Sequence, residues 1–169
     1  MKFLVLAAVL LLPLTAHAYS TYNGRWEDPT LTHSEPAELA PYVTGAFAEW
    51  ATAAPVRDAG TGDDVVFEWG DPLEDWAGQS TLMGSETDST RYVHCTVTLD
   101  RAWWDDHGED ARRWLVLHEL GHCLGLDHSQ GGVMDPAGSY TILQPDDVAG
   151  IRSIYGAMRP IHIALLASD

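Results

Sequence analysis

The stretch HELGHCLGLDH, residues 118–128, holds three of the eight histidines of the chain. His118 and His122 are four residues apart, so on a helix both rings lie on one face with Cβ atoms about 5–6 Å apart. Zinc–nitrogen bonds of about 2.0–2.1 Å allow one ion to bind both rings across that gap. The spacing predicts a metal site, and a His-rich surface helix is the alternative.

The residues after His122 can supply a third ligand. Gly125 can adopt a positive φ and end the helix, so that the chain turns and His128 approaches the same ion. Three neutral nitrogens leave a fourth position for water, which is typical of catalytic zinc sites. Glu119 is not needed as a ligand and can accept the proton of that water. The stretch therefore predicts peptide-bond hydrolysis without a covalent intermediate.

A helix with this role needs a sheet and other helices to position it. Apolar residues recur at helical spacing in three segments, which predict helices over residues 36–53, 110–124 and 145–156. Ser34 is the expected N-cap of the first helix, with Pro36 in its first turn. Apolar runs and alternations predict strands, over residues 30–33, 65–69, 79–83 and 92–99. The stretch RDAGTGDD, residues 57–64, is predicted as a loop.

The strand over residues 92–99 has the clearest alternation. Its residues divide into an apolar face with Val93, Cys95, Val97 and Leu99, and an opposite face with Tyr92, His94, Thr96 and Thr98. The first face is expected to be buried. His94 is expected to face solvent.

The first 18 residues are predicted to be a signal peptide. Lys2 precedes an apolar run from Phe3 to Leu14, and Ala16-His17-Ala18 has the small-x-small pattern of a cleavage site. The run is too short for a membrane anchor. The mature chain is therefore expected to begin at Tyr19 and to be secreted into the periplasm or the extracellular space, with a buried N-terminal helix as the alternative.

Composition limits the partners. The chain has 169 residues and a net charge of −16, and removal of Lys2 with the leader makes the charge −17. So acidic a surface repels nucleic acid and anionic lipid. The length allows one domain, expected over residues 19–156, with a tail over residues 157–169. A monomer with a protein or peptide substrate is expected.

The motif His118-Glu-x-x-His-x-x-Gly-x-x-His, with Met134 downstream in GGVMDP, resembles the metzincin zinc proteases. Within them it is most similar to the matrixins, especially their short bacterial relatives. Further resemblance lies in five segments, HELGHCLGLDHS, GVMDP, LQPDDVAGIRSIYG, AFAEW and VVFEWG, and covers most of residues 25–156. It implies an α+β, metzincin-like catalytic domain, with a twisted, mostly parallel mixed sheet, three helices and a small C-terminal subdomain from about residue 129.

The same resemblance assigns roles to residues. It implies zinc ligands at His118, His122 and His128, and a general base at Glu119. Met134 would lie beneath the metal. Pro136 and Tyr140 would form the wall of the pocket beside the scissile bond, although Tyr140 can equally be a packing residue.

Two further elements match the family pattern. Residues 79–83 would be the edge strand that pairs with an extended substrate. Asp146 and Asp147 match a pair that braces the turn around Met134, and the preference of acidic residues for helix starts explains them equally well.

The chain departs from animal matrixins in its first half. Only His94 and His107 lie between residue 34 and His118, so the second, structural zinc site of those enzymes is expected to be absent. No propeptide cysteine lies between Ala18 and Arg25. Calcium is possible at the acidic loops TGDD and DDHGED, although such loops are more often simply solvated.

The two cysteines, Cys95 and Cys123, are expected to form a disulfide, because strand and helix of this fold pack together where they lie and exported proteins favour bridged pairs. Two buried thiols are the alternative. The prediction for the whole chain is a zinc endopeptidase. A non-catalytic binding module that keeps the fold, and a fragment of a toxin or adhesin, are the competing hypotheses.

Overall fold

A computed structural model describes residues 19–73 and 76–157, so the predicted signal peptide and residues 158–169 of the tail lie outside it. The helices are α1 (Ala40–Trp50), α2 (Arg101–Asp106), α3 (Glu109–Cys123) and α4 (Pro145–Tyr155). The strands are β1 (Ser20–Thr21), β2 (Thr30–Ser34), β3 (Arg57–Thr61), β4 (Val65–Gly70), β5 (Gly78–Gly84), β6 (Tyr92–Asp100) and β7 (Leu126–Asp127). Among the helices of the described residues, none is both long and apolar enough to cross a membrane.

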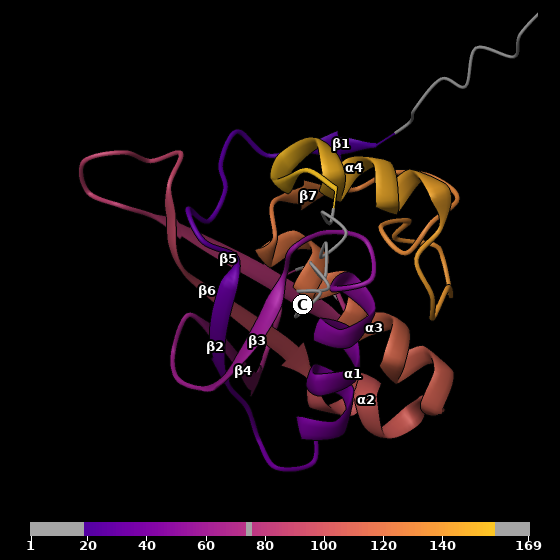
Figure 1. Ribbon diagram of the computed structural model, residues 1–169. Coiled ribbons are helices and arrows are strands. Elements are labelled where there is room, and N and C mark those ends of the chain that lie inside the picture. The colour runs from indigo at the N-terminus through magenta and orange to yellow at the C-terminus, as the bar shows by residue number, and fades with distance from the viewer. Residues whose placement is uncertain (1–18, 74–75, 158–169) are drawn as a thin grey trace, which may run out of the picture.

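A five-stranded sheet with the order β3-β2-β4-β6-β5 forms one layer. Every neighbouring pair is parallel except β5 and β6, which are antiparallel. Helices α1 and α3 lie together against this sheet, and α4 lies beside the short strands β1 and β7 (Figure 1). The expected α+β architecture with a mostly parallel mixed sheet is confirmed, and the short helix α2 is an addition to the three predicted helices.

The prediction was wrong at the first helix and at the loop that follows it. Helix α1 begins at Ala40, with Leu39 as N-cap and Pro41 in its first turn, and Ser34 is instead the last residue of β2. Proline in the first turn has its φ already suited to a helix, which favours this later start. Residues 57–61 form strand β3, whose side chains are all exposed. An exposed edge strand needs no apolar alternation, so the pattern did not indicate it.

The alternation of β6 holds over most of the strand and breaks at its beginning. Cys95, Val97 and Leu99 are buried as expected, but Val93 is 44% exposed and Tyr92 is buried. The pairing with β5 shifts register between Met83 and Gly84. This irregularity reverses the faces of the first two residues of the strand.

Close contact between α1, α3 and the turn around Met134 depends on Gly121. A Cβ atom at this position would lie 2.4 Å from Met134 Sδ and 2.8 Å from Trp50 Cζ2. Trp50 cannot move easily, because its indole N–H donates a hydrogen bond to the carbonyl of Leu117 at 3.0 Å. Only glycine therefore fits between His118 and His122 of α3 without displacing the core.

We expect Gly121→Ala to lower the free energy of unfolding by about 1–3 kcal/mol, because the added methyl group overpacks the core. Gly45→Ala in α1 is the matched control, since a Cβ atom there meets nothing within 4 Å and alanine favours the helix by up to about 1 kcal/mol. Urea unfolding of both variants measures the difference. Equal stability of the two would contradict the packing described.

Candidate active site

Three histidine rings converge at the end of α3. The Nε2 atom of His122 lies 3.1 Å from that of His118 and 3.2 Å from that of His128. Helix α3 carries the first two rings, and Gly125, with φ of 100°, redirects the chain toward the third. A side chain at Gly125 is disfavoured for a second reason, since its Cβ atom would lie 3.0 Å from the carbonyl oxygen of Gly24.

Backbone carbonyls fix which nitrogen of His118 and of His122 faces the centre of the group. His118 Nδ1 lies 2.7 Å from the carbonyl of Val133, and His122 Nδ1 lies 2.8 Å from that of Leu126. A carbonyl can only accept, so each Nδ1 is the donor and each Nε2 keeps its lone pair. Burial is the main cause that lowers the pKa of His118 to about 3 and that of His122 to about 4. Both rings are therefore neutral at physiological pH.

The donor set fits a zinc ion. Two nitrogens bound to one ion at about 2.0–2.1 Å and the tetrahedral angle lie about 3.3–3.4 Å apart, close to the separations found here. Lone pairs that face one another at this distance repel unless a cation lies between them. The group His118, His122 and His128 has all its ligand atoms within 4.8 Å of one another, and it could hold one metal ion and leave a coordination position open.

Glu119 lies beside this group and is almost fully buried, with 4% of its surface exposed. The hydroxyl of Ser80, from β5, donates to Glu119 Oε2 at 2.7 Å and to its backbone oxygen at 3.0 Å. Burial raises the pKa of the Glu119 carboxyl to about 7, against the opposing effect of the Ser80 hydrogen bond. The strand also approaches closely at Gly78, where a Cβ atom would lie 2.9 Å from Glu119 Oε1.

The turn around Met134 is held by a buried carboxylate. Asp147 is 1% exposed and accepts the backbone N–H groups of Val133 at 2.9 Å, Met134 at 3.1 Å and Gln144 at 2.7 Å. The last bond belongs to the capping box of α4, so Asp147 both starts the helix and braces the turn. The Val133 carbonyl in this turn accepts from His118, which connects Asp147 to the orientation of that ring.

A cavity of about 650 Å³ opens over the histidines and Glu119. Pro136 lines it, whereas Tyr140 is not among its lining residues and is 41% exposed. The structure thus brings Pro136 to the cleft and leaves Tyr140 at the surface. Residues 78–80 of β5 also line the cavity.

Sequence reasoning missed Tyr22 and Ser80 at this cavity. Tyr22 lines the cavity and its ring centroid is 6.0 Å from that of His122. Burial, with smaller contributions from Asp127 and Glu119, raises the pKa of the Tyr22 phenol to about 12. The signal for Ser80 was its place on the predicted edge strand, while no local pattern marked Tyr22.

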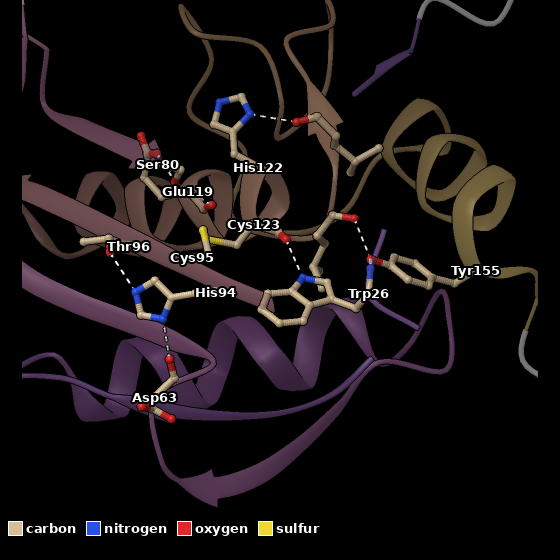
Figure 2. The surroundings of a disulfide bond; sticks show 12 residues. Trp26, Asp63, Ser80, His94, Cys95, Thr96, Glu119, His122, Cys123 and Tyr155 are labelled. Carbon is tan, nitrogen blue, oxygen red and sulfur yellow. Dashed lines mark hydrogen bonds between the residues drawn. A yellow bond between two sulfur atoms is a disulfide. The ribbon is translucent and has the colours of Figure 1, made fainter. Parts of the chain in front are cut away.

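His94 and Asp64, which lie outside the three-histidine group, form hydrogen bonds with other residues of the protein. His94 is half-buried, with Nδ1 2.7 Å from the carbonyl of Asp63 and Nε2 3.0 Å from the hydroxyl of Thr96 (Figure 2). In the loop TGDD, Asp64 accepts from the backbone N–H and hydroxyl of Thr32 at 2.8 and 2.7 Å.

The expected disulfide is present between Cys95 of β6 and Cys123, the last residue of α3 (Figure 2). Both residues are fully buried. Next to it, the indole of Trp26 donates to the Cys123 carbonyl at 2.8 Å, and the hydroxyl of Tyr155 donates to the Leu124 carbonyl at 2.9 Å. These bonds satisfy carbonyls that the end of a helix leaves without partners. The end of α3 is therefore attached to the sheet, to the N-terminal segment and to α4.

We expect the double variant Cys95→Ala/Cys123→Ala to lose about 3–4 kcal/mol of unfolding free energy. The bridge joins residues 28 apart in sequence, and opening a loop of this size restores chain entropy to the unfolded state. Urea titration measures the free energy of unfolding of the variant and of the wild type with and without dithiothreitol. The variant should be about as stable as the reduced wild type. An unchanged unfolding midpoint would contradict the prediction.

The chain is similar in sequence to known proteins of one family, as the following matches show. The family model for matrixin matches residues 17–156. The chain is 29% identical over 163 residues to matrix metalloproteinase-19 of Mus musculus, covering 81% of the chain and 30% of the relative. It is 25% identical over 175 residues to interstitial collagenase B of Mus musculus, covering 87% and 37%. A shorter match, 43% over 65 residues, covers 34% of the chain and 13% of interstitial collagenase of Bos taurus. The chain spans between 13% and 37% of the length of these relatives.

Proposed function

The chain belongs to the matrixin family, and from this premise we propose that it is a secreted zinc endopeptidase that hydrolyses peptide bonds. The observation that carries the proposal is the convergence of three Nε2 atoms beside a buried carboxylate in one cavity. His118, His122 and His128 are the proposed zinc ligands, and Glu119 is the proposed general base. When bound, zinc supplies a Lewis acid that polarises the scissile carbonyl and makes a water molecule more acidic.

Glu119 carries the proton transfers in this proposal. The Ser80 hydroxyl occupies Oε2, so Oε1 is the oxygen available to take a proton from water. After attack on the carbonyl, the same carboxyl returns the proton to the leaving amine, which departs as a neutral group. A pKa near neutrality suits a group that must accept and then donate a proton.

The substrate would bind as an extended strand along β5. This strand is the last in the sheet order, and residues 78–80 line the cavity. A peptide that pairs with this edge would bring its scissile bond over Glu119. Pro136 would form part of the pocket wall, and Met134 an apolar floor.

Secretion is supported by the leader pattern of residues 1–18 and by the buried disulfide. Disulfides persist in oxidising compartments, which include the periplasm and the extracellular space. We propose one of these locations for the mature chain, with a protein or peptide as substrate.

The competing hypothesis is a metal-binding module without catalysis. Burial of a carboxylate is costly, and such a module has no use for Glu119 at this position. The test is to purify the chain from residue 19, measure zinc per chain by mass spectrometry and follow cleavage of a denatured protein. The proposal requires about one zinc per chain and cleavage. Zinc without cleavage would favour the binding module.

A further inference from the structure

Tyr22, the residue after strand β1, lines the cleft. Strand β1 pairs with β7, the segment between the second and third histidines, with Ser20 opposite Asp127 and Thr21 opposite Leu126. The Tyr22 backbone N–H extends this pairing by donating to the carbonyl of Gly125 at 2.9 Å. The pairing brings the Tyr22 ring into the cavity beside His122.

Asp127 places a carboxylate next to this ring. It lines the same cavity and is near enough to the Tyr22 hydroxyl to interact with it. Its orientation is fixed by two bonds, from the His128 backbone N–H to Oδ1 at 2.8 Å and from the Ser20 hydroxyl to Oδ2 at 3.2 Å. Both donors are neutral groups, so neither brings a positive charge to the Asp127 carboxylate.

No cationic side chain balances this charge within the cavity. Its acidic lining residues, among those that the structure describes, are Glu119 and Asp127, and neither lysine nor arginine lines it. The chain as a whole has a net charge of −16. A carboxylate that no lysine or arginine balances attracts a cationic side chain and repels an anionic one, against the opposing charge of a metal ion at the histidines.

We infer that Tyr22 and Asp127 form a subsite for a lysine or arginine side chain of the peptide substrate. The aromatic ring offers its face to the cation, and the carboxylate offers a charge partner in a partly enclosed site. Glutamate or aspartate at the same substrate position is repelled. The inference rests on the proposed function, since it names the substrate class of that site.

Binding can be measured apart from cleavage. The zinc-loaded Glu119→Gln chain is titrated with peptides that carry arginine, leucine or glutamate at each position in turn. At one position, the arginine peptide should bind about tenfold more tightly than the leucine peptide, with the glutamate peptide weakest. The preference should decrease between about 0.05 and 0.5 M salt, because salt screens the charges.

Variants distinguish the contribution of this subsite to arginine binding from that of the net negative charge of the chain. Tyr22→Leu and Asp127→Asn, each added to Glu119→Gln, should reduce the arginine-to-leucine ratio of affinities to below about threefold. Asparagine still accepts the His128 N–H, and zinc content with thermal melting verifies that both variants are folded. Asp106→Asn, at an exposed residue of α2, removes the same charge elsewhere and should leave the ratio unchanged.

The outcomes distinguish the two proposals. Equal affinity for all peptides, or a preference that survives both variants, overturns the subsite even where the wild-type chain cleaves peptides. An arginine preference that is lost in both variants supports the subsite, even where the wild-type chain cleaves nothing and the proposed hydrolase is wrong.

Discussion

Replacing Glu119 by glutamine is expected to lower kcat/KM for peptide cleavage by about 10²–10⁴-fold and to leave the zinc content unchanged. The amide keeps the size of the side chain and can still accept the Ser80 hydroxyl, so the fold should persist. It cannot take a proton from water or return one to the leaving amine. Because the carboxylate is 4% exposed, no other side chain can easily replace it.

The measurement compares cleavage of one fluorogenic peptide by wild type and variant at equal zinc content. Glu68→Gln is the matched control, because Glu68 is an exposed residue of β4 and its loss should leave kcat/KM unchanged. A Glu119→Gln enzyme that keeps more than about a tenth of the wild-type rate would show that this carboxylate is not the base.

Removal of zinc is expected to abolish cleavage and to destabilise the domain by about 4 kcal/mol, for a comparison with free zinc at about 1,000 times its Kd. The unfolded chain does not hold the three rings together, so the free energy of metal binding adds to that of folding. The lost cation also leaves the Nε2 lone pairs of His118, His122 and His128 facing one another. Thermal melting with and without chelator measures the change in stability. Adding zinc back should restore both the stability and the cleavage activity.

Two histidine variants test whether the effect of the chelator arises at the three-histidine group. His122→Ala should melt at the same temperature with and without chelator, since it has lost a ligand. His107→Ala should respond like the wild type, because His107 stacks on Trp103 at 3.8 Å and lies outside the three-histidine group. A wild-type melting temperature that is insensitive to chelator would refute the metal site.

Local spacing was enough to predict helix α3 and the residues of the proposed metal site that it carries. The positions of His118, Glu119 and His122 follow from the period of a helix, and the change of direction at Gly125 follows from the conformational freedom of glycine. Cys95 and Cys123 could be paired because exported proteins favour bridged cysteines and because the strand and helix of the resembled fold pack together there. These properties depend on neighbours within a few residues, or on the family pattern.

Other features depend on segments that meet only when the chain is folded. Strand β3 is an exposed edge, so its residues carry no apolar alternation, and the two-residue strands β1 and β7 are too short to produce a pattern. The hydrogen bond from Ser80 to Glu119 joins residues 39 apart, and the pairing of Ser20 with Asp127 joins residues 107 apart. The sequence by itself thus determined the histidines, their glutamate and the helix that carries them. Only the tertiary structure decided which residues surround them, because that choice is made by long-range packing and backbone pairing.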